Sequence, residues 1–291
     1  MSTLSLAVTD SATMLRRSLR HMQRYPSMTL LILGMPVVFL LLFVYVFGGT
    51  LGAGLGGVTH SRAVYVNYVT PGIILLTVAA AAQATAISVA MDMTEGIIAR
   101  FRTMAIARSS VLTGHVLGSL IQSMLGVAVV IGIAVAIGFR PTANLAEWIA
   151  AAGVLAMISF ALIWLSVALG LVSKSVETAS NLPMFLLLLP FLGSGFVPTD
   201  SMPAGVRWFA EYQPFTPATE TVRGLLLGTP IGNNAIIAVA WCAGIGDDYV
   251  DYVTPGILLF TIVGAAQSTS IQVATDMAEG IIARFRTMSI W

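Results

Sequence analysis

Long apolar runs dominate this chain and restrict what it can fold into. Hydrophobic residues make up 57% of its 291 residues and charged residues only 9%, whereas soluble domains typically carry about 25% charged residues. A soluble fold of this length has too little interior for so much apolar surface, so its solvent must be lipid. A membrane helix needs about 20 apolar residues, and the chain has room for roughly six. We therefore predict an all-α, polytopic transmembrane helical bundle of about six spans.

Five apolar runs are predicted to span the membrane. They lie at 28–47, 68–91, 111–139, 148–172 and 182–197, and Thr70-Pro71-Gly72 is expected to open the second. The first run follows a basic segment and is too long for the apolar region of a signal peptide, so we expect it to stay as an anchor. Residues 199–228 are too polar to span and are rich in proline and aromatic residues, which favours short interfacial helices.

An amphipathic helix is predicted at 5–24, ahead of the first span. Apolar residues recur there on a single helical stripe, and four arginines occupy the remaining surface. The stripe consists of Val8, Ala12, Leu15, Leu19 and Met22, and the arginines are Arg16, Arg17, Arg20 and Arg24. A basic helix of this kind lies in the headgroup plane with its apolar side toward the lipid. The alternative is a solvated face with no specific role.

The basic residues orient the spans. Through residue 230, eight arginines and lysines fall on one side of the predicted membrane and four on the other. Since the side richer in lysine and arginine faces the cytoplasm, we expect the N-terminus and residues 92–108 to be cytoplasmic and 199–228 to be outside.

The C-terminal segment repeats an earlier part of the chain. Residues 247–291 duplicate 63–107, and 28 of 39 positions are identical between 68–106 and 252–290. A structural repeat diverges further than this, so we interpret the copy as a recent duplication, a recombination event or a chimera. We therefore divide the chain into 1–246 and 247–291.

The copy leaves two topologies open for the C-terminal part. If 231–246 spans the membrane, the basic end of the copy falls outside. If 231–246 does not span, the copy supplies the last span and its basic end falls inside. Sixteen helical residues measure about 24 Å against a hydrocarbon core of about 30 Å, and the positive-inside rule also favours the second topology.

Several function classes find no residues to support them. There is no phosphate-binding G-x-x-x-x-G-K-[ST] motif, no H-E-x-x-H motif and no G-x-S-x-G motif. Cys242 is the single cysteine and the net charge is +1, so we expect no disulfide, metal site or nucleic-acid partner. The chain is therefore not expected to be an enzyme or to bind a cofactor itself.

The charged segment at 92–108 is the most informative connection. A short helix beginning at Glu95 would place Ile97, Ile98 and Phe101 on one face and direct Arg100 and Arg102 elsewhere. Such a helix can present an apolar knob to a soluble partner. A simple basic tether between two spans fits the residues equally well.

Polar residues inside the predicted spans are few. They are Gln83, Gln122, Ser166 and Asn181. Polar groups in lipid are often functional, which makes Gln83, Gln122 and Asn181 candidates for a substrate path. Interhelical hydrogen bonds explain them as well, and we favour that interpretation.

Several motifs in fixed order resemble one known family. They are Glu-Gly-Ile-Ile-Ala-Arg-Phe-Arg-Thr-Met-Ala-Ile-Ala-Arg-Ser at 95–109, Gly-Phe-Arg-Pro-Thr at 138–142, Phe-Val-Pro at 196–198 with Met-Pro at 202–203, and Phe-Ala-Glu-Tyr-Gln-Pro-Phe-Thr-Pro at 209–217. Over about residues 5–245 the chain resembles permease subunits of type-2 ABC exporters, in particular the daunorubicin-resistance type of actinobacteria. It departs from that family after Ile245, where members complete a sixth span.

The resemblance implies a function. The chain would be the permease of an exporter in the bacterial plasma membrane, moving a hydrophobic or amphiphilic drug, antibiotic or lipid outward. ATP would act through a separate ATPase subunit, and a second permease copy would complete a homodimer. The resemblance also implies that Glu95, Ile98, Arg100, Phe101 and Arg102 couple the permease to the ATPase. A secondary transporter driven by an ion gradient and an inactive scaffold or chimera are the alternatives.

Overall fold

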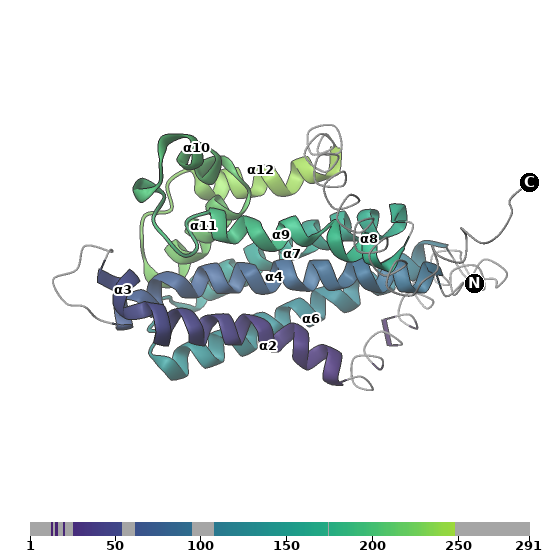
Figure 1. Cartoon of the computed structure of the whole chain (residues 1–291), viewed down its shortest axis with the longest axis horizontal. Coiled ribbons are helices and arrows are strands. Elements are labelled where there is room, and N and C mark those ends of the chain that lie inside the picture. The colour runs from purple at the N-terminus through teal and green to yellow at the C-terminus, as the bar shows by residue number, and fades with distance from the viewer. Residues whose placement is uncertain are drawn as a thin grey trace, which may run out of the picture. The chain divides into compact units, whose positions relative to one another are not determined.

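A computed structural model of the chain describes residues 26–53, 62–94, 108–173 and 175–247, together with Thr13, Leu15, Arg16 and Arg20. Residues up to Gly246 form one compact unit, and in the described ranges every regular element is helical (Figure 1). In chain order these elements are α2 (Pro26–Leu42), the π-helical turn η1 (Phe43–Phe47), α3 (Gly48–Ala53), α4 (Arg62–Thr94), α6 (Arg108–Ile137), α7 (Leu145–Val172), α8 (Val176–Asn181), α9 (Met184–Leu188), the 3-10 turns η2 (Leu189–Leu192) and η3 (Thr199–Ser201), α10 (Ala204–Tyr212), α11 (Phe215–Leu227) and α12 (Asn234–Asp247).

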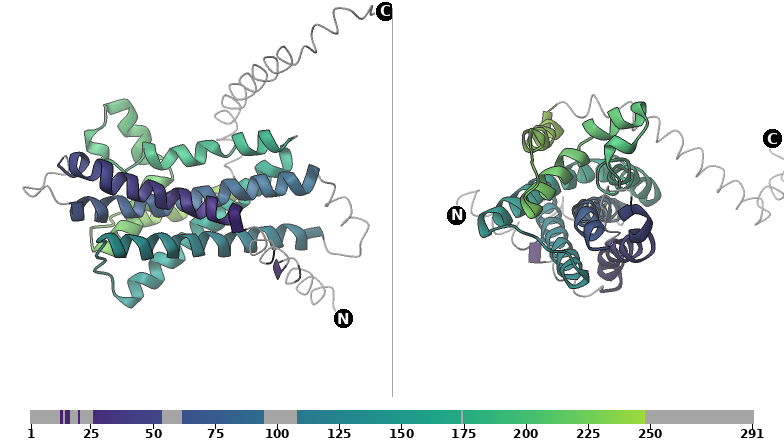
Figure 2. Two further views of the ribbon diagram at one scale, coloured as in Figure 1. Left: turned by 60° about the horizontal axis from the view of Figure 1, so that its bottom comes forward. Right: turned by 90° about the vertical axis from the view of Figure 1, so that its left-hand side faces the viewer.

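Four helical runs are long and apolar enough to cross a membrane. They are Gly34–Leu51, Arg62–Thr94, Gly114–Ile137 and Leu145–Val172. They correspond to the first four predicted spans and lie side by side, as the end-on view in Figure 2 also shows. The prediction of a polytopic helical membrane protein is therefore confirmed.

α4 is the central helix of this bundle. Its span is 72% buried, and it contacts α2, α6, α7, α8 and α11. Its sequence has almost no amphipathic character, as expected of a membrane-spanning helix that is apolar on all faces. Because α4 is one uninterrupted helix, it connects the two ends of the bundle.

Pro71 does not open the second span, contrary to the prediction. α4 begins nine residues earlier, at Arg62, and Pro71 lies inside it. Membrane helices tolerate an internal proline where neighbouring helices surround it. The preceding turn is held by Thr70, whose Oγ1 donates to the carbonyl of Val66 at 2.6 Å.

The predicted fifth span at 182–197 is not one continuous helix, and the apolar helical run found there, Val176–Leu192, has other bounds than predicted. The segment contains α9 and η2, is preceded by α8, and is not helical from Gly193 to Pro198. Pro183 caps the N-terminus of α9 and Pro190 lies in η2. Each proline removes a backbone donor and crowds the preceding turn, so α8 and α9 are separated at Pro183, and α9 passes into 3-10 geometry at Pro190.

Residues 199–228 form short helices, as predicted, and of these η3 and α10 lie at the surface. α11 is mostly buried and packs against α4 and α7. It ends at Gly228, whose φ of 71° is the left-handed conformation that glycine adopts without strain.

α12 is too short to cross the hydrocarbon core as an ideal helix. Its 14 residues measure about 21 Å against about 30 Å. The copy at 248–291, which we predicted to supply the last span, lies outside the described residues. The predicted interfacial helix at 5–24 is described at four residues, all helical, and its place at the membrane surface stays a prediction.

Candidate functional site

The predicted coupling residues lie outside the described residues. These are Glu95, Ile98, Arg100, Phe101 and Arg102. The helices on either side of them are described: α4 ends at Thr94 and α6 begins at Arg108. Both helix termini lie at one end of the bundle, opposite α10 (Figure 1). We call this the coupling end, and the other the α10 end.

One polar contact joins α4 and α6 at the coupling end. Nε2 of His115 donates to Oδ2 of Asp92 at 2.9 Å. The two side chains are 15% and 14% exposed, so both are largely withdrawn from solvent. Asp92 lies two residues before the end of α4, which places this contact directly beside the predicted coupling segment.

Apolar packing surrounds that contact on the side of the bundle interior. Val89, Val116, Ile163 and Val167 form a buried cluster that joins α4, α6 and α7. Close to it, a Cβ placed on Gly170 would lie 2.7 Å from the carbonyl oxygen of Ala86. α4 and α7 therefore approach each other as closely as a glycine permits, which is how small residues act in membrane bundles.

The predicted polar path residues do not form one group. Gln83 donates through Nε2 to the carbonyl of Ser180 at 3.0 Å, which places it beside Asn181 in α8. Gln122 is half-buried on a different helix, α6. The Gln83 contact is an interhelical hydrogen bond, which is the packing role that we favoured for this residue.

A buried arginine organises the α10 end. Arg223, on α11, is 6% exposed, and its Nη1 donates to the carboxylate of Glu220. Its Nη2 donates to two backbone carbonyls, that of Ser194 at 2.8 Å and that of Tyr68 at 3.1 Å. The guanidinium also lies 4.1 Å from the centroid of the Tyr68 ring. One side chain thus joins α11, α4 and the chain that follows η2.

The chain that follows η2 is fixed by further contacts. Tyr68 donates its hydroxyl to the carbonyl of Ser194 at 2.9 Å, and the Ser194 amide donates to Oγ1 of Thr216 at 3.2 Å. A Cβ on Gly72 would lie 2.7 Å from two backbone atoms of Gly195. This irregular backbone is therefore buried in protein, the condition under which membrane proteins tolerate non-helical chain.

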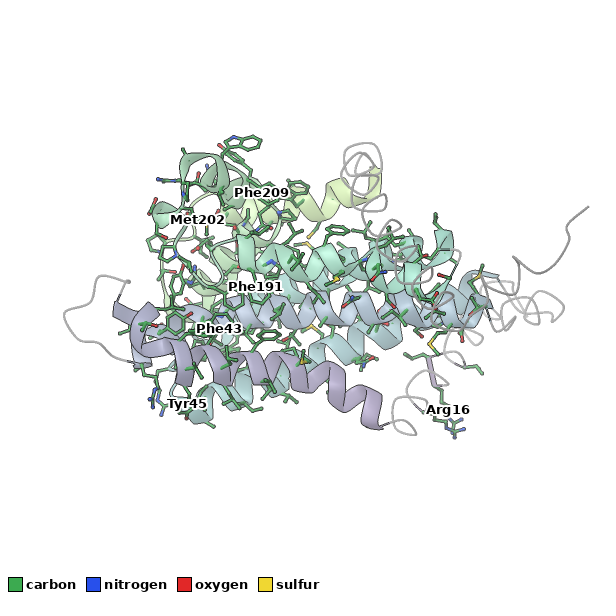
Figure 3. All side chains as sticks on the ribbon, viewed as in Figure 1. Arg16, Phe43, Tyr45, Phe191, Met202 and Phe209 are labelled. Carbon is green, nitrogen blue, oxygen red and sulfur yellow. The ribbon has the colours of Figure 1, made fainter. Side chains whose placement is uncertain are left out.

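Three aromatic rings close the same region on the side of α2. The rings of Phe191 and Phe196 stack at 4.5 Å and 8°, and Phe43 packs on Phe196 at 4.6 Å. Figure 3 shows Phe43 and Phe191 close together. Phe43 begins η1, and π-helical turns of this kind are frequent at functional sites.

A small apolar crevice lies between α7, α11 and α12. Its lining residues are Ile158, Leu162, Pro214, Phe215, Ala218, Ala238, Trp241 and Cys242. Such a lining suits a hydrophobic group. Within the described ranges, no three His, Cys, Asp or Glu side chains come together as a metal ion would require.

Sequence reasoning missed Arg223, because it counted this residue as a charge in an outer loop. The signal was present in the pattern: a lone arginine between Val222 and Gly224-Leu225-Leu226, with Glu220 three residues before it on the same helical face. It also missed the contact between Asp92 and His115, since 23 residues separate them and each stands alone in an apolar run.

Known proteins resemble this chain along most of its length. It matches the family model described as ABC-2 type transporter over residues 10–227. It is 28% identical over 224 residues to a daunorubicin resistance ABC transporter permease protein of Streptomyces coeruleorubidus, with 77% of each chain covered. It is 25% identical over 209 residues to a probable doxorubicin resistance ABC transporter permease protein of Mycobacterium tuberculosis, covering 72% of this chain and 75% of that one.

Proposed function

Because the chain belongs to the ABC-2 type transporter family, we propose that it is the permease subunit of an ATP-driven exporter whose ATPase is a separate chain. The observation that carries this proposal is the family match over residues 10–227, which includes all four long helices in full and the segment between α4 and α6. The chain supplies the membrane path, and ATP acts through the partner.

The segment that meets the ATPase is Glu95–Met104, with Ile98, Arg100, Phe101 and Arg102 as its contact residues. Support comes from the alternation of apolar and basic residues there and from its place between two long helices. α4 continues from this segment through the centre of the bundle to the α10 end. A push at the coupling end therefore has a rigid element to act on.

The coupling end faces the cytoplasm of a bacterial cell, with the N-terminus on the same side. This orientation is supported by the excess of arginine and lysine predicted there. A second copy of the permease would complete the transport path, and each copy would bind one ATPase.

The exported compound is hydrophobic or amphiphilic. Two relatives are named for resistance to daunorubicin or doxorubicin, and the crevice beside α12 has an apolar lining. Gln83, Gln122 and Asn181 stay candidates for the path. A compound that contacted Gln83 would compete with its bond to the carbonyl of Ser180.

The chain contains its own control for testing the coupling segment. Glu-Gly-Ile-Ile-Ala-Arg-Phe-Arg-Thr-Met occurs at 95–104 and again, unchanged, at 279–288. The experiment is to purify the tagged permease from membranes and to measure ATP hydrolysis by the subunit that accompanies it. The variant Arg100→Glu/Arg102→Glu is compared with Arg284→Glu/Arg286→Glu, which makes the same charge change in the copy.

The expected result is that an ATPase accompanies the wild type and the 284/286 variant but not the 100/102 variant. If the 284/286 variant alone loses the ATPase, the coupling segment is in the copy. If no ATPase accompanies the wild-type chain, the exporter proposal is wrong and the scaffold interpretation gains support.

A further inference from the structure

A polar contact between two long helices has so far no role in the proposed mechanism. Asp92 and His115 join the last turn of α4 to the second turn of α6 at 2.9 Å. Neither residue belongs to the coupling residues or to the candidate path. Both are nevertheless ionisable side chains within two candidate membrane spans, Arg62–Thr94 and Gly114–Ile137, where such residues usually serve a function.

Local helix electrostatics do not explain the placement of Asp92. The C-terminal end of a helix carries partial negative charge, so a carboxylate in the last turn of α4 is unfavourable. His115 lies beyond the first turn of α6, too far from that helix's terminus to serve as a cap. The contact across the helices is therefore what favours these two side chains at these two positions.

The surroundings strengthen the contact. Val89 lies one turn before Asp92, Val116 follows His115, and both belong to the buried cluster shared with α7. Side chains that are 14% and 15% exposed lie in a medium of lower effective dielectric than water, in which a polar contact is stronger and its loss more harmful. The pair thus lies at the coupling end of the apolar contact between α4 and α6.

We propose that Asp92 and His115 are a positioning pair that makes α4 and α6 move together when the ATPase acts. This inference rests on the proposed function. The two helices leave the same short segment, so a push on that segment can either separate them or shift them as one unit. The bond between Asp92 and His115 opposes separation, and the movement then passes along α4 to the α10 end.

The test uses the complete transporter, reconstituted in vesicles, and measures drug transported per ATP hydrolysed. His115→Leu introduces an apolar side chain of similar length and removes the donor. His115→Gln keeps a nitrogen donor that can reach Asp92. Ser123→Ala is the matched control, because it removes another interhelical bond of α6, that between the hydroxyls of Ser123 and Ser159 at 3.2 Å.

We expect His115→Leu to lower the ratio of transport to hydrolysis about five- to tenfold, a size typical of residues that carry coupling between sites. His115→Gln should stay within about twofold of the wild type, and Ser123→Ala should leave the ratio unchanged. A merely structural contact would change the yield and the thermal stability of the complex but not this ratio.

Two results would overturn the pair's role. One is a normal ratio in His115→Leu. The other is an equal loss in His115→Leu and Ser123→Ala, since this would assign the effect to packing in general.

A second measurement covers poor folding of the leucine variant: spin labels on Ser88→Cys and Ile121→Cys, in a Cys242→Ser background, report the α4–α6 separation. With the pair intact we expect this separation to stay constant when ATP binds, and a change would refute the proposal. Failure of the exporter proposal is distinguishable, because no ATPase would then accompany even the wild type.

Discussion

The guanidinium of Arg223 lies over the ring of Tyr68, 4.1 Å from its centroid, and donates to the Tyr68 backbone carbonyl at 3.1 Å. The two residues are 155 positions apart in the chain. Their contact joins the buried helix α11 to the central helix α4. The same guanidinium binds the carbonyl of Ser194 and the carboxylate of Glu220, so α11, α4 and the broken segment depend on one side chain.

Arg223→Met should therefore destabilise the permease. The substitution keeps the apolar stem but leaves the partly buried Glu220 without its cation and removes one donor from each of the carbonyls of Tyr68 and Ser194. Breaking a buried pair of this kind costs about 3 kcal/mol. The measurement is the unfolding midpoint of the purified permease in detergent. Arg207→Met is the control, because Arg207 pairs with Asp200 and Glu211 at the exposed surface of α10. If both variants unfold at the same midpoint, the burial of Arg223 has no energetic importance.

Gly72→Ala should also destabilise the bundle, by overpacking. A Cβ at this position meets the backbone of Gly195 at a distance that no real contact shows, and backbone cannot swing aside as a flexible side chain can. Inserting a methyl group into such a contact typically costs about 1–3 kcal/mol. The matched control is Gly153→Ala on α7, where a Cβ meets nothing within 4 Å and alanine favours the helix. Thermal unfolding of both variants decides the point: equal stability at the two sites would mean that α4 and the broken segment are not in close contact.

The long spans could be predicted from sequence because length and apolar composition are sufficient to define them. α4, α6 and α7 begin or end within a few residues of the apolar runs, except at Arg62, where α4 extends beyond the run by more than one turn. The break at Pro183 and Pro190 could not be predicted in the same way. Pro36 and Pro71 lie inside helices, so a proline alone does not decide whether a membrane helix breaks.

Tertiary contact accommodates the non-helical chain that follows η2. The close approach of Gly195 to Gly72 and the bonds of Ser194 to Tyr68, Thr216 and Arg223 satisfy a non-helical backbone that lipid would not. These partners are far apart in sequence. The same reasoning applies to Asp92 and His115, which became a pair only when α4 and α6 were placed side by side.

Phe101→Asp should abolish transport without preventing membrane insertion. An apolar ring on the coupling segment is expected to enter a groove of the ATPase, and a carboxylate there would be buried without a partner. Phe285→Asp makes the same change in the copy at 279–288 and should transport normally. The measurement is drug efflux from cells that carry the permease and its ATPase, with the amount of permease in the membrane determined in parallel. Normal efflux by Phe101→Asp would show that this ring does not carry the coupling.

The orientation of the duplicated tail can be tested with single cysteines. Cys242 is the only cysteine of the chain, so Cys242→Ser provides a background without thiols. In that background Thr103→Cys marks the coupling segment, Thr287→Cys marks the same position of the copy, and Ser201→Cys marks the α10 end. A maleimide that cannot cross the membrane is applied to intact and to permeabilised cells. We expect it to label Ser201→Cys in intact cells and the other two only after permeabilisation, because α12 has 14 residues and the basic end of the copy favours the cytoplasm. Labelling of Thr287→Cys in intact cells would mean instead that the helix beginning at Asn234 completes a crossing, and that the copy returns its arginines to the outside.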